Sequence, residues 1–272
     1  QGASTMVDIH SHILPGIDDG SPSWEVSLEM CRRAAADGVT IMAATPHMLD
    51  GVYNFDRPRA LALVAELNQR LQAAGIALRV VPGGDVRVCP EMLEQVLQKQ
   101  VCTLGDTGRY LLVEFPHDLM PTGSLEQMFA LRVKGIQPIF SHPERNYAIQ
   151  QRPEILREWV DMEVLLQVTA GSFTGAFGRV AEKLAWEMAK QGMAHIVASD
   201  AHDLERRAPG MSAARELLSE CLSEEELKAA FELRPRYIIE GRNVSVPPIR
   251  PAAPKPSIFR RWFPWQTSHK TR

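Results

Sequence analysis

The sequence lacks the signatures of several common enzyme classes. Its four cysteines (Cys31, Cys89, Cys102 and Cys221) are widely spaced and form no CxxC pair. They therefore predict reduced thiols in the cytoplasm rather than a disulfide framework or a structural zinc site. No cysteine has an arginine six residues later, which excludes the phosphate loop of cysteine-dependent phosphatases. The GxSxG elbow of serine hydrolases and the P-loop of nucleotide-binding proteins are also absent.

Long apolar runs are missing as well. No stretch of 18 or more apolar residues occurs, which argues against a membrane-spanning helix. The first five residues carry neither the basic nor the apolar region of a secretory signal. With 45% hydrophobic and 23% charged residues, the composition is that of a globular protein. We therefore expect a cytoplasmic location and no nucleic-acid partner.

Acidic residues are missing from the C-terminal end. From Gly241 onward there are seven basic residues and no acidic one. The rest of the chain therefore contains 23 of the 30 basic residues and all 33 acidic residues. We expect one domain over residues 6–245 and a flexible, proline-rich tail over residues 246–272. Interleaved aromatic and basic residues in the tail suit contact with acidic lipid headgroups at the inner membrane, and a disordered basic tail is the alternative. These residues are Phe259, Arg260, Arg261, Trp262, Phe263 and Trp265.

Short apolar runs alternate with amphipathic segments through most of the chain. Strands separated by helices imply parallel pairing, because a crossover must connect them. Seven such units predict an α/β fold, either a closed or nearly closed β/α barrel or, as the alternative, a doubly wound open sheet. Strands are expected at 7–10, 39–44, 77–82, 110–114, 137–141, 164–168 and 195–199. Helices are expected at 21–38, 57–74, 90–99, 125–134, 153–162, 179–191 and 212–233, followed by a short segment at 237–239.

Ionisable residues recur at the C-terminal ends of these expected strands. In a β/α barrel those ends converge on one face, where such enzymes build their active sites. Residues up to 190 positions apart would then share one pocket. A single histidine at a strand end is more commonly a packing residue, but this many at successive ends indicates a site. The nine candidates are His10, His12, Asp19, His47, Asp85, Glu114, His142, Asp200 and His202.

The chemistry of these candidates indicates a metal centre. Mixed imidazole and carboxylate ligands suit divalent ions such as Mn, Fe, Co or Zn. Nine ligands exceed the requirement of one ion and predict two or three. Asp18, next to Asp19, is expected to shape the turn before Gly20.

Five motifs in order resemble one known family. "DIHSHILPGIDDG", "ATPH", "LLVEFP", "SHPERN" and "SDAHD", with "QVTAGSFTG" between the last two, are similar to motifs of the polymerase and histidinol phosphatase (PHP) superfamily. The likeness is greater to its manganese-dependent protein-tyrosine phosphatases of bacterial capsule and exopolysaccharide loci. This resemblance covers about Met6 to Gly241. It implies a distorted (β/α)7 TIM-like barrel with a trinuclear metal site.

The resemblance also implies a role for each candidate. One ion would be held by His10, His12 and Asp200 with Asp85 as a bridge, a second by Glu114 and His142, and a third by Asp19, His47 and His202. The two arginines of the motifs, Arg145 and Arg207, would bind the substrate phosphate. Water activated at the metal ions, rather than a cysteine, would attack phosphotyrosine on a membrane tyrosine kinase of polysaccharide export.

Two positions depart from the family pattern. The bridging residue is usually glutamate, whereas this chain has Asp85, and a second histidine often follows "ATPH" where this chain has Met48. These differences leave open two other interpretations. The first is a phosphatase of a small ester such as histidinol phosphate, and the second is a binding module with an impaired site.

Overall fold

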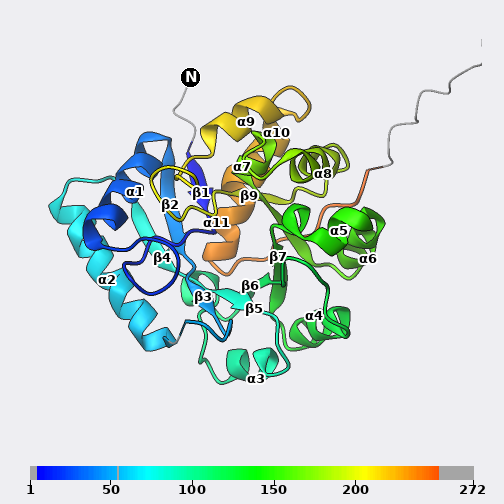
Figure 1. Ribbon diagram of the computed structural model, residues 1–272, viewed down its shortest axis with the longest axis horizontal. Helices are drawn as coiled ribbons and strands as arrows, with labels where there is room; N and C mark the ends of the chain where they lie inside the picture. The colour runs from blue at the N-terminus through cyan, green and yellow to red at the C-terminus, as the bar shows by residue number, and fades with distance from the viewer. Residues whose placement is uncertain (1–4, 54, 251–272) are drawn as a thin grey trace, which may run out of the picture.

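The structure is a computed structural model and describes residues 5–53 and 55–250. Within these residues nine parallel strands alternate with helices (Figure 1). The strands are β1 (Met6–Asp8), β2 (Val39–Ala44), β3 (His47–Met48), β4 (Arg79–Pro82), β5 (Asp85–Arg87), β6 (Tyr110–Glu114), β7 (Gln137–Ser141), β8 (Leu165–Thr169) and β9 (Ile196–Ala198).

Most helices lie around the outside of the strand arrangement, whereas α11 lies at its middle in this view (Figure 1). In the described part of the chain the α-helices are α1 (Trp24–Ala36), α2 (Arg57–Ala73), α3 (Met92–Leu97), α4 (Ser124–Val133), α5 (Tyr147–Gln151), α6 (Leu156–Asp161), α7 (Ala170–Phe173), α8 (Arg179–Lys190), α9 (Ser212–Leu218), α10 (Glu224–Lys228) and α11 (Arg234–Ile239). Shorter helical segments are η1 (Leu104–Asp106), η2 (Pro143–Arg145), η3 (Pro153–Ile155) and η4 (Ala229–Leu233).

The strands form two parallel sheets that together make a ring. The first has the order β1-β2-β4 and the second the order β3-β5-β6-β7-β8-β9. Only residues 45–46 separate β2 from β3, and only residues 83–84 separate β4 from β5, so each pair is one kinked strand. The described residues thus contain seven strand positions, and a parallel bridge between Ser11 and Ala201 joins the ends of the ring. The predicted seven-unit α/β fold is confirmed.

The kinks come from residues that interrupt regular pairing. Pro46 has no N–H to donate, and an added Cβ at Gly84 would lie 2.7 Å from Met48 Sδ. Beyond the kink, His47 and Asp85 face each other as Cα partners in the β3–β5 pair. Both residues follow the expected strands, β2 and β4, but each also begins a short further strand that was not expected, because the chain resumes strand pairing after each kink.

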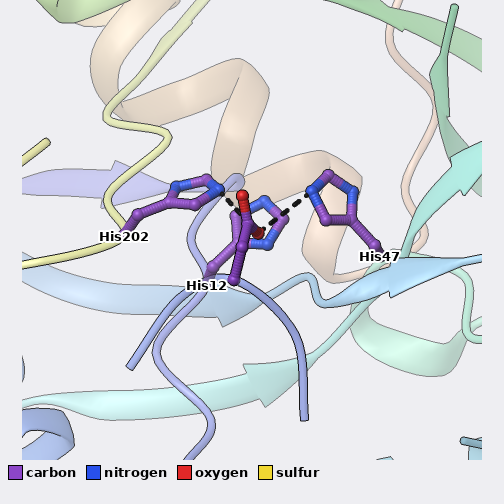
Figure 2. Close-up of side chains that lie close together, drawn as sticks. His12, His47 and His202 are labelled. Carbon is purple, nitrogen blue, oxygen red and sulfur yellow. Dashed lines mark ion pairs between the residues drawn. The ribbon is translucent and has the colours of Figure 1, made fainter. Parts of the chain in front are cut away.

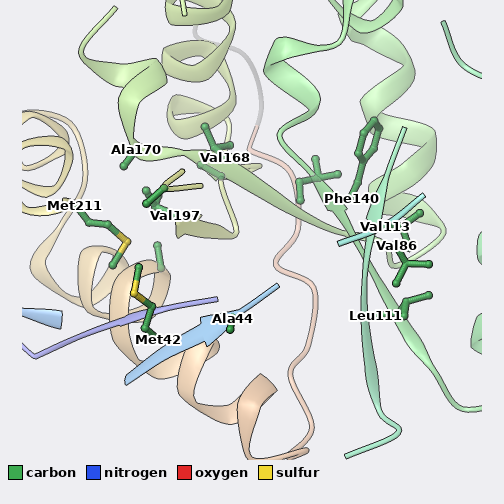
Figure 3. Close-up of a cluster of buried hydrophobic side chains, with 14 of the residues drawn as sticks. Met42, Ala44, Val86, Leu111, Val113, Phe140, Val168, Ala170, Val197 and Met211 are labelled. Carbon is green, nitrogen blue, oxygen red and sulfur yellow. The ribbon is translucent and has the colours of Figure 1, made fainter. Parts of the chain in front are cut away.

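Alternate strand residues pack on opposite faces, as the strand period of two requires. On β6, Leu112 belongs to an inner cluster, whereas Leu111 and Val113 belong to the outer core between strands and helices. Figure 3 shows part of this outer core. All seven strand positions contribute to the inner cluster, so the ring encloses a packed core. Its strand members are Val7, Ala43, Val81, Tyr110, Leu112, Ile139, Leu165, Ile196 and Ala198, and they are joined by Ile9 directly after β1, Leu104 of η1, and Ile238 and Ile239 of α11.

Several expected boundaries were wrong for local reasons. Helix α1 begins at Trp24 with Ser23 as its N-cap, because Ser21 instead donates its N–H to His12 O at 2.9 Å. The helices expected within 212–233 are α9, α10 and η4, and a capping box at Ser223 starts α10. The short segment at 237–239 is part of helix α11.

The described start of the expected tail lies against the body. Val246 and Ile249 are partly buried against the core, and Arg250 N donates to Gln191 O at 2.8 Å. The aromatic and basic stretch of residues 259–265 lies outside the described residues. Among the residues that the structure describes, no helix has both the length and the hydropathy needed to cross a membrane.

His195 makes the fold sensitive to acid. Its Nδ1 accepts a hydrogen bond from Leu166 N at 3.0 Å, and burial lowers the pKa of His195 to about 3. The folded protein therefore keeps the ring neutral, while the unfolded chain takes up a proton as the pH falls below about 6.5. Stability is lost over that range. Asparagine keeps an acceptor but does not titrate. When the pH falls from 7.5 to 5.5, the free energy of unfolding of His195→Asn should therefore decrease by about 1 kcal/mol less than that of the wild type. Urea denaturation at both pH values measures this difference, and equal losses would contradict it.

Candidate metal centre

The nine candidate residues lie together at the carboxyl ends of the strands. Four sets of ligand atoms within the described residues each lie close enough to hold one ion, with all atoms within 4.8 Å of one another. The sets share members, so they form one continuous centre. They are His12, Asp19, His47 and His202; His10, His12 and Asp85; His10, His142 and Asp200; and His47, Asp85 and Glu114.

The outer part of the centre gathers around Asp19. His47 Nε2 and His202 Nε2 lie 3.3 and 3.4 Å from Asp19 Oδ1. Figure 2 shows the rings of His12, His47 and His202 facing a common point. Gly20 makes this possible, because an added Cβ there would lie 2.1 Å from His12 O. The turn that carries Asp19 can therefore pack directly on the segment after β1.

The inner part of the centre is buried and links the segment after β1, strand β5 and the segment after β9. His10 Nε2 lies 3.2 Å from Asp200 Oδ1 and 3.5 Å from Asp85 Oδ2. The same Asp85 oxygen lies 3.5 Å from His47 Nδ1, so Asp85 stands between the inner and outer parts. The aspartate side chain reaches this position from β5.

Glu114 and His142 stand further apart than the other neighbours. Their closest atoms, Oε1 and Nε2, are separated by 3.9 Å. Glu114 groups more closely with His47 and Asp85, and His142 groups with His10 and Asp200. The set predicted for the third ion, Asp19, His47 and His202, recurs as one group, with His12 added.

Two of the candidates adopt strained backbone conformations. His142, directly after β7, has φ 37°, and Asp200, shortly after β9, has φ 53°. This left-handed region costs a residue other than glycine about 1–3 kcal/mol. Backbone bonds hold Asp200 there, since its N–H donates to His10 O at 2.8 Å. The strained backbone directs the side chains of both residues, one after β7 and one after β9, toward the other candidates.

Polar atoms that face the centre have no hydrogen-bond partner within the described residues. Buried polar atoms are normally paired, because an unpaired one costs about 1–3 kcal/mol. The donor types, imidazole nitrogen and carboxylate oxygen without thiolate, are those of divalent-ion sites. The residues present therefore fit a metal centre. The unpaired atoms are His47 Nδ1, Asp85 Oδ1 and Oδ2, Glu114 Oε2, Asp200 Oδ1 and His202 Nε2.

The charges of the centre are strongly coupled. Burial and the Asp85 carboxylate raise the pKa of Glu114 to about 7. Burial alone would lower the pKa of His10, but Asp200 and Asp85 raise it to about 9. Carboxylates held this close together in a buried site repel one another and attract cations.

Arg145 and Arg207 lie at the edge of the centre. Both guanidinium groups form ion pairs with Asp200 Oδ2, while Oδ1 of the same carboxylate faces the histidines. The Arg145 guanidinium also stacks on the ring of Phe177, 4.1 Å from its centroid. Two fixed guanidinium groups therefore stand next to the candidate ligands, as an anion-binding role requires.

Three supporting residues were missed at the level of sequence. Asp18 shapes the turn as expected, but its Oδ2 also lies 2.8 Å from His12 Nδ1. Gln167 Oε1 lies 2.9 Å from His10 Nδ1, and Arg87 Nη2 lies 3.3 Å from Glu114 Oε2. Asp18 and Arg87 lie within two residues of a candidate ligand and Gln167 begins the "QVTAGSFTG" segment, yet only the fold shows which ring or carboxylate each one contacts.

Gln167 should control how His10 presents its free nitrogen. An amide oxygen only accepts, so His10 Nδ1 donates to Gln167 Oε1 and leaves Nε2 toward the centre. Removing such a supporting partner typically weakens metal binding about 10- to 100-fold. We expect this loss for Gln167→Leu, measured by competition with a fluorescent chelator. An unchanged metal affinity would show that packing alone orients His10.

Comparison with known proteins identifies the family. The model of the family described as "Capsular polysaccharide synthesis, CpsB/CapC" matches residues 6–240. The chain belongs to the CpsB/CapC family. It is 37% identical over 202 residues to the tyrosine-protein phosphatase YwqE of Bacillus subtilis, which covers 74% of this chain and 79% of YwqE. It is 27% identical to the tyrosine-protein phosphatase CpsB of Streptococcus pneumoniae, which covers 86% of this chain and 98% of CpsB.

Solved structures agree with this membership. A crystal structure from work on Bacillus subtilis YwqE and Streptococcus pneumoniae CpsB, described as unique metal-dependent tyrosine phosphatases, matches with a TM-score of 0.86 and 32% identity. The match covers 91% of this chain and 100% of that one. Histidinol phosphate phosphatase of Lactococcus lactis shares the fold alone, with a TM-score of 0.50 and 13% identity over 80% of this chain and 94% of that chain.

Proposed function

We propose that this chain is a metal-dependent phosphatase that hydrolyses phosphotyrosine in proteins. One observation carries the proposal: nine imidazole and carboxylate side chains converge, with unpaired buried atoms facing inward and two arginines beside them. Membership of the CpsB/CapC family, with relatives named tyrosine-protein phosphatases, supports the choice of substrate. The nine residues act as metal ligands, and Arg145 and Arg207 bind the phosphate.

The side chains divide the work of phosphate ester hydrolysis between them. Two or three divalent ions, when bound, would neutralise phosphoryl charge and lower the pKa of a bound water from its bulk value to about 7. The histidines and carboxylates hold those ions at fixed positions. Arg145 and Arg207 orient the phosphoryl oxygens and stabilise the charge that develops on them. A cysteine nucleophile is not required.

Manganese is the proposed metal, with iron, cobalt or zinc as competitors. The centre contains no thiolate among its candidate ligands, which disfavours ions that prefer sulfur. Asp85 takes the place of the glutamate usual at the bridge. Because its carboxylate lies 3.5 Å from both His10 and His47, we propose an intact site rather than an impaired one.

The proposed partner is a membrane tyrosine kinase of polysaccharide export, and the proposed location is the inner face of the inner membrane. The tail after Arg250 carries five basic residues and no acidic one, which suits anionic lipid. Co-sedimentation with phosphatidylglycerol vesicles should decrease for a chain that ends at Arg250. Equal binding by both chains would refute the membrane contact.

The substrate is tested with matched phosphopeptides. The manganese-loaded protein should hydrolyse a phosphotyrosyl peptide with a higher kcat/KM than either the phosphoseryl peptide of the same sequence or histidinol phosphate. Chelation should abolish the activity. A preference for histidinol phosphate would instead favour a small-ester phosphatase, and no metal-dependent turnover of any substrate would favour a binding module.

A further inference from the structure

The loop after β3 holds a tyrosine beside the outer part of the centre. Asp50 Oδ1 accepts hydrogen bonds from Val52 N at 2.9 Å and Tyr53 N at 3.0 Å. Gly51 has φ 81°, a conformation that glycine adopts without strain. This turn fixes the backbone of Tyr53 and sets the direction of its side chain.

The ring of Tyr53 stacks on the ring of His47. Their centroids are 6.0 Å apart and their planes differ by 10°, which is an offset parallel arrangement. A tyrosine phenol is uncharged at physiological pH and is a weak acid. Tyr53 therefore offers a neutral aromatic surface rather than a nucleophile or an acid.

Tyr53 lies on the solvent side of the centre. The side chains of His10 and Asp85 are 0% exposed, whereas those of His47 and Asp19 are 13% and 45% exposed. A phosphate ester with its phosphoryl group among the candidate ligands must direct its leaving group outward. On the side of His47, that path runs past the partly exposed ring of Tyr53.

We propose that Tyr53 is a specificity-determining residue whose ring stacks on the aromatic leaving group of the substrate. The proposal rests on the proposed phosphatase function and adds a structural reason for phosphotyrosine over alkyl phosphates. An aromatic pair of this kind contributes roughly three- to tenfold to binding. Tyr53 thereby favours aryl esters, while the metal centre and the arginines treat all phosphate groups alike.

The test compares aromatic and aliphatic ligands on the full-length manganese-loaded protein. Tyr53→Leu removes the ring, and Tyr53→Phe keeps it. Tyr237→Leu is the matched control, since Tyr237 lies in α11, which carries no candidate ligand, and its ring is covered by the Arg242 guanidinium. The kcat/KM values for phenyl phosphate and β-glycerophosphate are measured for each protein. Calorimetry with benzylphosphonate and ethylphosphonate gives binding without turnover.

Tyr53→Leu should lower kcat/KM for phenyl phosphate and the affinity for benzylphosphonate by about three- to tenfold. Its values for β-glycerophosphate and ethylphosphonate should stay close to those of wild type, as should all values for the two other variants. Equal losses on aromatic and aliphatic ligands, or no loss on either, would overturn the proposal. Absence of turnover by the wild type would refute the phosphatase function instead, while the phosphonate affinities would still decide the role of Tyr53.

Discussion

Asp85→Asn is expected to lower kcat/KM for a phosphotyrosyl peptide by about a thousandfold. Asparagine keeps the shape of the side chain but removes its charge. Asp85 ionises readily, because the neighbouring His10 and His47 hold its pKa below the usual range against the effect of burial. Neither of its oxygens has a hydrogen-bond partner in the described residues, and the carboxylate stands between two groups of candidate ligands. The loss of this one charge should therefore affect more than one ion.

The metal content separates this effect from a general loss of structure. Asp85→Asn should bind fewer manganese ions per chain than wild type, as measured by plasma mass spectrometry, and keep a cooperative unfolding transition. Asp161→Asn is the matched control, because Asp161 is exposed at the end of α6. An Asp85→Asn protein with wild-type metal content and activity would contradict a bridging role.

Arg145→Met should lower kcat/KM by roughly a hundredfold and leave the metal content unchanged. Two charge-assisted hydrogen bonds to a phosphoryl group contribute about 3 kcal/mol, and methionine provides none of them. Arg207→Met should have a smaller effect, since the Arg207 side chain is 25% exposed against 12% for Arg145. Arg145→Lys should restore little activity, because an ammonium group cannot make the same paired contacts.

Inhibition by inorganic phosphate identifies the cause of this loss. If Arg145 binds the phosphoryl group, its replacement raises the inhibition constant of phosphate along with the loss of activity. Arg152→Met is the matched control, since the Arg152 side chain is 72% exposed. Loss of metal from Arg145→Met would instead assign Arg145 to support of Asp200.

The members of the centre were predictable because each lies in a short motif at or near a strand end. Once parallel strands are assigned, their carboxyl ends must meet on one face, and nine residues from distant motifs are brought together. The grouping within the centre was not predictable. It depends on the kinks at residues 45–46 and 83–84, which place His47 opposite Asp85. It depends also on the left-handed backbone of His142 and Asp200.

The secondary structure was likewise predictable where the sequence pattern is clear, and not predictable where tertiary contacts decide it. Strand β6, over Tyr110–Glu114, matched its expected range, because buried apolar residues with clear punctuation define it. Strands β3 and β5 were not predicted. Each has only two or three residues, after Pro46 or after a glycine pair, and so short a segment shows no alternation of apolar and polar residues. The segment at 237–239 is short and apolar, and its sequence alone does not define its structure. It forms the end of helix α11, where Ile238 and Ile239 pack in the inner cluster.

The most direct test of the account is the number of metal ions that activity requires. Protein stripped with chelator and titrated with manganese should gain phosphotyrosyl-peptide hydrolysis in step with binding, and full activity should require two or three ions per chain. Equilibrium dialysis with plasma mass spectrometry gives the stoichiometry, and a parallel assay gives the rate. Full activity in the metal-free protein, or saturation at one ion, would contradict a shared centre built from all nine residues.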